Sequence, residues 1–360
     1  MPASEAFVES VFSAWESGDA VFPVDQRLPR QSRQSIVAEM GAAKVIDASG
    51  DATTLRTARP IEPGDALVIA TSGSTGEPKG VVHTHASIAA SAQASNLRLA
   101  TTRHDHWLAC LPVSHIGGFS VITRARLAGC QLSIHGSFDA RAAQIAARNG
   151  ATMTSLVNTA LARIDASLFR KILLGAGPAP KELPANIVKT YGMTETGSGV
   201  VYDGVALDGV EIRVDAEKEI FVRGAMLLRC YRDGIDPKTV DGWLATNDLG
   251  SYADGILRVS GRRGDLIITG GENVWPAQVE AAIAAHPSVS EVCVRGVADE
   301  AWGQRVVAWI VTKQDAAITL EATREWVKQT LPSFCAPHEI RLLEKLPRTS
   351  VGKIDTAKLR

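Results

Sequence analysis

The sequence predicts an α/β protein with a large N-terminal domain followed by a small α+β domain. From about residue 66 to 193, short apolar strands alternate with helical stretches, which is typical of a mostly parallel sheet covered on both faces. Over residues 203–261 short strands are separated by Asp-Gly and similar turns, which predicts an antiparallel meander and a small β-barrel. Mixed helix and strand patterns then return. We therefore predict an N-terminal domain over residues 1–261 and a C-terminal domain over residues 262–360.

The individual elements follow from the spacing of apolar residues. Residues 4–16 have the spacing of an amphipathic helix, and a strand, helix, strand unit is expected between residues 20 and 47. In the central part the predicted strands are 107–111, 131–134, 153–157 and 171–174, and the predicted helices are 118–127 and 140–148. In the β-rich part the predicted strands are 210–214, 219–223 and 255–259.

Length and charge fit a two-domain protein with balanced charge. At 360 residues the chain exceeds what one hydrophobic core usually covers. It carries 38 Lys and Arg against 39 Asp and Glu, so neither nucleic acid nor an anionic membrane is suggested as a partner. An apolar run of about 18 residues and a basic-then-apolar start are both lacking in the sequence, so we expect no membrane insertion and a cytoplasmic location.

The cysteines and histidines do not predict a metal site. Five cysteines, an odd number without a C-x-x-C pair, indicate reduced core thiols. Histidines occur as His83-x-His85 and His104-x-His106, but no third ligand at a plausible spacing accompanies them. We therefore interpret these histidines as ordinary strand or turn residues.

The strongest functional signal is the segment T-S-G-S-T-G-E-P-K-G from Thr71 to Gly80. An apolar run precedes it and Val81-Val82 follows, which predicts a loop between two buried strands. Its glycines let backbone N–H groups approach an anion, its hydroxyls donate hydrogen bonds and its lysine adds a charge, which suits a polyphosphate. The P-loop pattern of nucleotide triphosphatases cannot be placed, because Gly80 follows Lys79. The candidate phosphate-binding residues are Thr71, Ser72, Gly73, Ser74, Thr75, Gly76 and Lys79.

A histidine and two arginines that follow the predicted strand 107–111 are further candidates. His115 lies at the carboxyl end of this strand, where a lone histidine is usually structural. Arg124 and Arg126 lie on the next helix among apolar neighbours. Such arginines are normally solvated. If one of them faces a pocket instead, its guanidinium would pair with a carboxylate on the substrate.

Six motifs in order resemble the adenylate-forming superfamily, which contains acyl-CoA synthetases, adenylation domains of peptide synthetases, and luciferases. They are the loop at 71–80, G-A-G-P-A-P at 175–180, Y-G-M-T-E-T at 191–196, T-N-D-L-G at 246–250, G-G-E-N at 270–273 and L-P-R-T-S-V-G-K at 346–353. The chain departs from the family in three places. It is short before the phosphate loop, Asn247 replaces the usual Gly of T-G-D-L-G, and Gly264 stands where the family's hinge is usually Asp or Lys. Asn also tolerates positive φ, so we expect the turn at Asn247 to be kept.

The resemblance implies how the adenosine part of ATP is bound. The turn Gly175-Ala176-Gly177 would lie against the adenine ring, and Tyr191, next to Gly192, would stack on it. Asp248 would accept hydrogen bonds from the ribose hydroxyls, and Arg262 would contact the ribose as well.

The resemblance also implies the reaction. A carboxylate would attack the α-phosphorus of ATP to give an acyl-adenylate and pyrophosphate, and CoA would then displace AMP. Thr194 would donate to the α-phosphate, and Glu195 would hold Mg²⁺, which needs only one or two protein carboxylates. Lys353 would be the catalytic lysine that contacts both the substrate carboxylate and the α-phosphate. The C-terminal domain would rotate about residues 262–265 between the two steps. The loop Gly270, Gly271, Glu272 and Asn273 would then line the channel for CoA.

Among members of the superfamily, the chain looks most like the o-succinylbenzoate-CoA ligases of menaquinone synthesis, particularly the compact actinobacterial type. That resemblance implies that His115 lines the acyl pocket and that Arg124 binds a substrate carboxylate. Another aryl- or acyl-CoA ligase, a stand-alone adenylation enzyme that loads a carrier protein, and a non-enzymatic nucleotide-binding protein are the alternatives. A homodimer is possible.

Overall fold

The structure is a computed structural model that describes residues 2–56, 58–72, 78–175, 182–314, 316–348 and 354–359. The chain divides into two compact units. Unit 1 comprises residues 1–213, 221–245 and 252–257, and unit 2 comprises residues 214–220, 246–251 and 258–360. Unit 2 thus holds two short segments that lie before the predicted boundary near residue 262, and that boundary stays a prediction.

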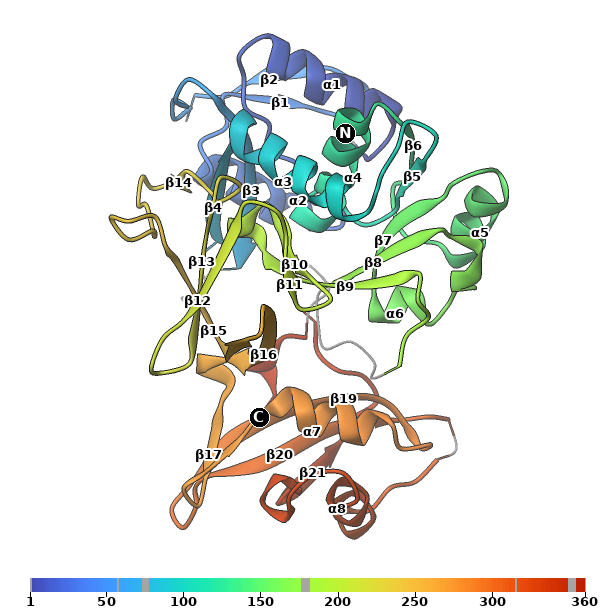
Figure 1. Ribbon diagram of the computed structural model, residues 1–360, viewed down its shortest axis with the longest axis vertical. Coiled ribbons are helices and arrows are strands. Elements are labelled where there is room, and N and C mark those ends of the chain that lie inside the picture. Colours follow the sequence, from blue (N-terminus) through green and yellow to red (C-terminus); the bar gives the residue numbers. More distant parts are fainter. Residues whose placement is uncertain are drawn as a thin grey trace. The chain divides into compact units, whose positions relative to one another are not determined.

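A parallel sheet forms the centre of unit 1, as predicted (Figure 1). Its strand order is β6-β5-β7-β8-β9, and every neighbouring pair in this part is parallel. Their bounds are β5 His106–Ala109, β6 Gln131–Ile134, β7 Met153–Val157, β8 Lys171–Gly175 and β9 Ile187–Met193. The apolar strand residues are fully buried, with Trp107, Leu108 and Ile172 at 0% exposure. Burial of this kind explains why the strands read as continuous apolar runs in the sequence.

Helices cover both faces of the parallel strands. Helix α4 (Ile116–Ala128) packs on the face that carries Trp107, and α3 (His85–Arg98) packs on α4. On the other face, Ala143 of α5 (Ala140–Arg148) and Ala160 of the short α6 (Asn158–Leu161) share a core with Leu108. Two helices on opposite faces follow from right-handed crossovers that alternate in direction from a central strand.

Antiparallel strands continue the same sheet. Strand β10 (Ser198–Tyr202) pairs with β9, and β11 (Val205–Ala206) pairs with β10. The order then runs through β16 (Ile256–Arg262), β15 (Leu244–Ala253) and β13 (Glu219–Gly224) to β12 (Val210–Val214) at the edge. The stretch predicted as a small barrel is therefore rich in strands, as expected, but five of its strands belong to the large sheet, and its remaining strand, β14 (Cys230–Tyr231), belongs to a second sheet.

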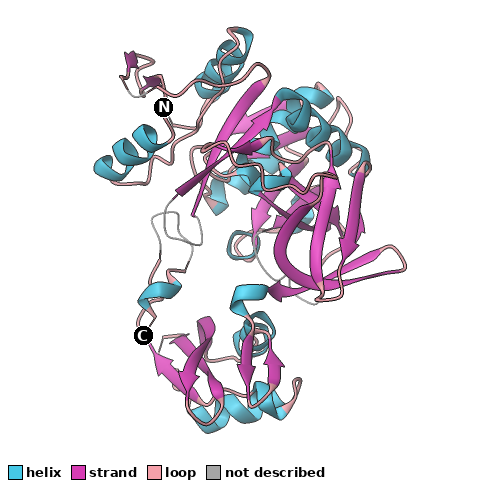
Figure 2. Cartoon of the chain, turned by 90° about the vertical axis from the view of Figure 1, so that its left-hand side faces the viewer, coloured by secondary structure: helices cyan, strands magenta, loops and turns pink. Residues whose placement is uncertain are grey.

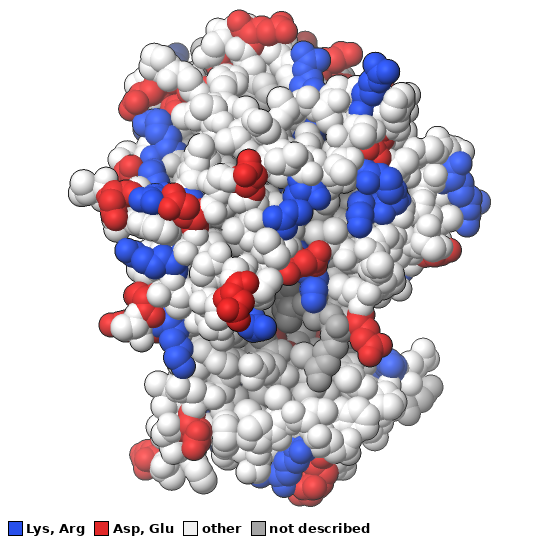
Figure 3. Space-filling model, in the orientation of Figure 1, with Lys and Arg blue, Asp and Glu red and all other residues white. Residues whose placement is uncertain are grey.

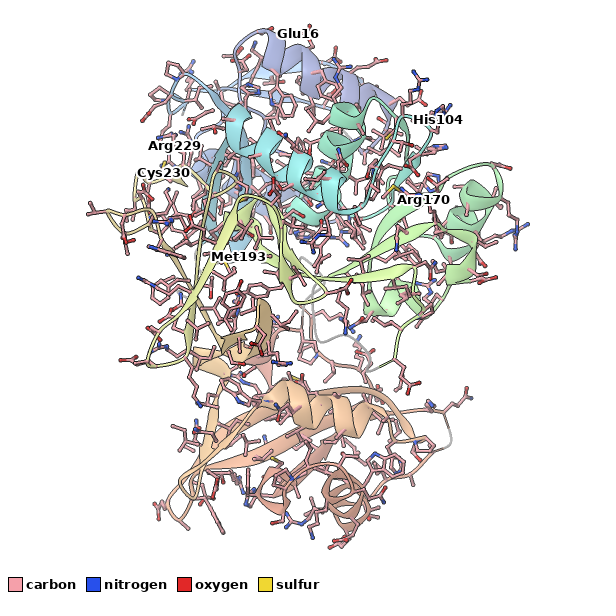
Figure 4. All side chains as sticks on the ribbon, viewed as in Figure 1. Glu16, His104, Arg170, Met193, Arg229 and Cys230 are labelled. Atoms are coloured by element: carbon pink, nitrogen blue, oxygen red, sulfur yellow. The ribbon has the colours of Figure 1, made fainter. Side chains whose placement is uncertain are left out.

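A second sheet of unit 1 carries the phosphate-loop segment. Strands β3 (Asp65–Ser72) and β4 (Pro78–Thr84) form an antiparallel hairpin, and β14 (Cys230–Tyr231) pairs with β4. The two strands predicted on either side of the loop are thus confirmed. Figure 4 labels Arg229 and Cys230 beside this hairpin.

The N-terminal segment differs partly from its prediction. Helix α1 (Glu5–Glu16) forms where expected, and α2 (Arg30–Glu39) falls within the predicted helical region. Strand β1 (Lys44–Ile46) pairs with β2 (Ala52–Thr54). The strand expected from residue 20 is wrong: it is reduced to one bridge between Val21 and Leu67. Pro23 lacks the N–H that a longer ladder would need, which explains the interruption.

Most of unit 2 forms an α+β domain (Figure 2). Long strands β19 (Val289–Asp299) and β20 (Gly303–Thr312) pair antiparallel, and β21 (Glu339–Leu342) joins β20 in parallel. Helices α7 (Pro276–Ala284) and α8 (Leu320–Lys328) share one hydrophobic core on one face of these strands. The opposite face, with Trp309, packs against Leu346 and Leu359 near the C-terminus.

Charged side chains of both signs are interspersed over the face shown in Figure 3, in keeping with the balanced composition. None of the helices in the described ranges is long and apolar enough to span a lipid bilayer.

Candidate active site

The segment with Thr194 and Glu195 follows directly from the end of β9, at the carboxyl edge of the parallel strands. These residues form a 3₁₀ helix, Thr194–Thr196, and both Thr194 and Glu195 are half-buried. The buried Thr196 hydroxyl donates to the Ser198 carbonyl at 2.7 Å and accepts from the Met193 N–H at 2.9 Å. Both bonds hold the turn in one conformation. Ligands of parallel α/β sheets usually bind at this edge, so the position of the segment is compatible with a ligand site.

Glycines permit the tight packing of this turn. A Cβ atom on Gly192 would lie 2.1 Å from the Ser198 carbonyl oxygen. This distance is too short for any residue with a side chain, so the position requires glycine. Gly197 has φ +68°, a conformation that glycine adopts without strain. Ser198 itself has φ +137°, which is unusual for a residue with a side chain. Strain of this kind is often found at functional sites.

His83 contacts this turn, a contact that the sequence did not indicate. Its ring is fully buried in β4, and Nε2 lies 2.7 Å from the Thr194 carbonyl oxygen, 111 residues further along the chain. A carbonyl only accepts, so Nε2 carries the proton and donates. Burial lowers the pKa of His83 to about 4, which keeps the ring neutral near pH 7. The His-x-His pattern correctly placed His83 in a strand, but nothing local in the sequence identified its partner.

We expect His83 to make stability depend on pH. Its pKa is lowered in the folded state, so between pH 6.5 and 4 the unfolded chain binds a proton that the folded chain excludes. The free energy of unfolding should therefore fall by about 2 kcal/mol from pH 7 to pH 5 because of this residue. Urea unfolding of the native protein and of His83→Gln, which keeps an N–H donor, measures the difference. An equal fall in both proteins would contradict the assignment.

The phosphate-loop hairpin brings Lys79 near Glu195 through a tyrosine. The Lys79 ammonium lies 5.1 Å from the ring centre of Tyr231, and the Tyr231 hydroxyl donates to Glu195 Oε1 at 3.1 Å. Burial and the Glu195 charge raise the pKa of Tyr231, so its hydroxyl stays protonated. Thr71 and Lys79 face each other across the hairpin, where the Thr71 hydroxyl donates to the Lys79 carbonyl at 3.3 Å.

Several predicted residues of the nucleotide site are only partly described. Ser72 pairs with Pro78 through the backbone. Gly175 ends β8, with Thr190 of the neighbouring strand against it, and Tyr191 lies half-buried near the end of β9. Outside the described residues lie Gly73, Ser74, Thr75, Gly76, Ala176 and Gly177.

Arg124 is buried and lines a cavity at the carboxyl edge of the sheet. Its side chain is 2% exposed, and Nη2 donates to Ser198 Oγ at 2.7 Å. Its Nε has no hydrogen-bond partner among the described residues, and no carboxylate among them pairs with it. A cavity of about 90 Å³ is lined by Arg124, Ser155, Ser198 and Tyr202, among others, and the Ser155 hydroxyl is also buried without a partner in the described structure. A buried, unpaired cation beside a cavity suits an anionic ligand.

His115 and Arg126 lie on the same helix but in different surroundings. His115 is the half-buried residue at the start of α4, and its carbonyl accepts from two N–H groups of the first turn. Arg126 is exposed and lies over the ring of Phe12 at 4.8 Å. Of the two arginines considered on this helix, Arg124 is therefore the one that faces a cavity.

Unit 2 holds the residues predicted to contact the ribose. The Arg262 Nε lies 3.3 Å from Asp248 Oδ1, and Asp248 is 7% exposed. Asn247 has φ +58°, which confirms the expectation that Asn adopts the positive φ of this turn. In the same unit, the next residue, Arg263, forms ion pairs with Glu217 at 2.9 Å and Glu219 at 2.8 Å.

The predicted CoA loop is a tight hairpin. Strand β17 (Ile267–Thr269) pairs with β18 (Glu272–Val274), and Gly270 and Gly271 form the two-residue turn with φ +57° and +84°. Such turns need positive φ at both positions, which explains the two glycines. Glu272 and Asn273 are exposed beside the turn. Lys353 lies outside the described residues, between Arg348 and Ile354, which pair as an antiparallel bridge.

The carboxylate of Glu195 fits a magnesium ligand. Oε1 accepts from Tyr231, and Oε2 receives no hydrogen bond from any described residue. Mg²⁺ prefers hard oxygen ligands and usually takes few of them from the protein. The residues present therefore fit the ion that the sequence implies.

Two family models and several known proteins are similar to this chain. The family model "AMP-binding enzyme" matches residues 48–231, and "AMP-binding enzyme C-terminal domain" matches residues 278–353. A probable 2-succinylbenzoate-CoA ligase of Mycobacterium tuberculosis is 40% identical over 337 residues, which cover 85% of this chain and 86% of that protein.

Two solved structures of a Bacillus subtilis protein are also similar. O-succinylbenzoate CoA synthetase in complex with the acyl-adenylate OSB-AMP has a TM-score of 0.78 and 30% identity, and the match covers 98% of this chain and 80% of that one. The same synthetase with ATP and magnesium ion has a TM-score of 0.77 and 29% identity, over 98% and 81% of the two chains. The fold, the ordered motifs and these matches lead to one conclusion: the chain belongs to the AMP-binding enzyme family.

Proposed function

We propose that this chain is an AMP-forming acid-CoA ligase whose acid is 2-succinylbenzoate and whose co-substrates are ATP and CoA. The buried Arg124 carries the proposal. It lines a cavity, and no carboxylate of the described residues neutralises it. 2-Succinylbenzoate has two carboxylates, so that one can be activated while the other pairs with a cation. A monocarboxylic acid would leave the guanidinium unpaired, which is costly in a buried place.

The relatives support this choice of acid. The Mycobacterium tuberculosis protein is named for 2-succinylbenzoate, and the Bacillus subtilis synthetase was solved with OSB-AMP. Ser198 contributes to the same recognition, because its Oγ accepts from Arg124 and fixes the direction of the guanidinium. His115 begins the helix that carries Arg124, and we propose that it lines the acyl pocket.

The reaction has two steps. In the first, a carboxylate oxygen of the acid attacks the α-phosphorus of ATP, and the bond from that phosphorus to the pyrophosphate oxygen breaks. In the second, the CoA thiolate attacks the acyl carbonyl, and AMP leaves with the electrons of the acyl–oxygen bond. Two anions must meet in the first step, so the protein has to supply positive charge and alignment. Glu195 would hold Mg²⁺, and the bound ion would supply positive charge that offsets the phosphates.

We propose these roles for the chain's own residues. The loop 71–80 holds the β- and γ-phosphates, with Lys79 as its charge, and Thr194 donates to the α-phosphate. The ribose hydroxyls bind Asp248, next to Arg262. Lys353 contacts the reacting carboxylate and the α-phosphate. The turn at Gly270 and Gly271 lines the path of CoA.

Pyrophosphate exchange tests the proposal. Purified protein is given ATP, labelled pyrophosphate and one acid of a panel that contains 2-succinylbenzoate, benzoate, malonate and short fatty acids. We expect exchange with 2-succinylbenzoate and, on addition of CoA, formation of its thioester. Exchange with another acid only would discard 2-succinylbenzoate and keep the ligase class. Exchange without transfer to CoA would favour an enzyme that loads a carrier protein.

We further propose that the enzyme works in the cytoplasm, where ATP and CoA are available. A homodimer stays a prediction, which the mass of the purified protein in solution would test.

A further inference from the structure

One side chain, Tyr231, contacts both halves of the proposed MgATP site. Its hydroxyl donates to Glu195 Oε1 at 3.1 Å, and its ring lies 5.1 Å from the Lys79 ammonium. Glu195 belongs to the turn after β9, and Lys79 to the phosphate-loop hairpin. Tyr231 therefore links the carboxylate proposed for the metal to the lysine proposed for the phosphates.

The backbone of Tyr231 is fixed by hydrogen bonds and strand pairing. It pairs with Val81 through β14 and β4, and its N–H donates to the Ile235 carbonyl at 2.8 Å. The residues just before Tyr231 also contact the turn that carries Glu195, because the Leu228 N–H donates to the Glu195 carbonyl at 2.8 Å. Arg229 lies between Leu228 and Tyr231 in the sequence, and its Nε and Nη2 donate to the two carboxylate oxygens of the buried Asp65. A tyrosine held in this way can fix the direction of a neighbour.

The chemistry of the two contacts is complementary. The Tyr231 hydroxyl occupies one oxygen of Glu195, which leaves Oε2 for a metal. A fixed carboxylate loses less side-chain freedom when it takes a ligand. The ring face attracts the Lys79 cation. This contact keeps the ammonium beside the hairpin. A carboxylate in the same place would neutralise its charge, whereas the aromatic ring does not.

We propose that Tyr231 is a positioning residue for MgATP, which orients Glu195 for the metal through its hydroxyl and Lys79 for the phosphates through its ring. This inference rests on the proposed function, because Glu195 and Lys79 take their roles from it.

Two substitutions separate the two contacts. Tyr231→Phe removes only the hydroxyl, so we expect the Mg²⁺ concentration for half-maximal exchange to rise about tenfold, the size of a lost hydrogen bond to a charged group. Saturating Mg²⁺ should restore kcat, and KM for the acid should not change. Tyr231→Leu also removes the ring, and we expect KM for ATP to rise by a further factor of about three. The matched control is Tyr252→Phe, because Tyr252 is a tyrosine of β15 that is 40% exposed.

Calorimetric binding of a non-hydrolysable ATP analogue, with and without Mg²⁺, gives a readout that needs no turnover. We expect Tyr231→Phe to weaken binding only when Mg²⁺ is present. A lower melting temperature with an unchanged Mg²⁺ midpoint would show a purely structural tyrosine and overturn the proposal, as would equal weakening with and without Mg²⁺. If the native protein exchanges with no acid, the proposed function fails, yet the calorimetric comparison still decides the role of Tyr231.

Discussion

Replacing Arg124 by methionine should lower kcat/KM for 2-succinylbenzoate by about two to three orders of magnitude, because a buried charge pair loses one partner. Methionine fills most of the space of the arginine stem, so the cavity wall is kept. Binding of the ATP analogue, measured by calorimetry, should stay unchanged. Steady-state kinetics of thioester formation gives the main result.

The control for this substitution lies two residues further along the same helix. Arg126→Met removes an exposed arginine that packs over Phe12, and its kinetics should equal those of the native enzyme. A second expectation concerns stability without substrate. Arg124 is buried without a carboxylate partner in the described structure, so Arg124→Met should melt at the same temperature or higher. Equal losses from both variants, or a loss of ATP binding, would show that Arg124 supports the fold and not the acid.

Replacing Asp65 by asparagine should reduce the free energy of unfolding by about 3 kcal/mol, because Arg229 loses its buried carboxylate partner and keeps only the exposed Glu62, which lies 3.0 Å from its Nη1. The Asp65 side chain is 0% exposed, and Arg229 bonds it with Nε at 2.7 Å and Nη2 at 2.9 Å. This pair joins residues 164 positions apart, so it ties β14 to the start of β3. Urea unfolding at pH 7 measures the change.

Two further proteins make the Asp65 test specific. Asp65→Leu combined with Arg229→Met removes both charges, and we expect it to recover much of the lost stability. Arg223→Met breaks an ion pair with Glu211 whose side chains are 38% and 57% exposed, and it should change the unfolding free energy little. If Asp65→Asn unfolds like Arg223→Met, the buried pair contributes no more than a surface pair.

The parallel part of the fold could be predicted closely because its strands are buried on both faces. The predicted strands 131–134 and 153–157 and the predicted helix 140–148 agree with β6, β7 and α5 to the residue. Strand β9 was not predicted, because after Ile187 and Val188 it continues with Lys189, Thr190 and Tyr191. The polar end of β9 leads into the candidate site. The apolar pattern by which a buried strand is recognised in a sequence therefore stops before the strand ends.

The candidate site was predictable as motifs but not as a network. The sequence indicated Thr194, Glu195 and Arg124, yet it did not indicate His83, Tyr231 or Ser198, which bond to them. Those contacts span 111, 36 and 74 residues. Hydrogen bonds over such distances depend on how strands are ordered in the sheets, and neither residue type nor local spacing carries that information.

The ion pairs of Arg263 bear on how this enzyme could be recombined with its relatives. Glu217 and Glu219, its two partners, precede it by more than 40 positions but belong to the same compact unit. A graft that joins donor and recipient at residue 262 would carry Arg263 and leave both acids behind. A recipient with lysine at either place would then set like charges against each other, although every motif in the hybrid is intact. Residues 214–220 and 246–251 should therefore be exchanged together with the C-terminal segment, because the compact unit that contains Arg263 is built from three separate segments of the chain.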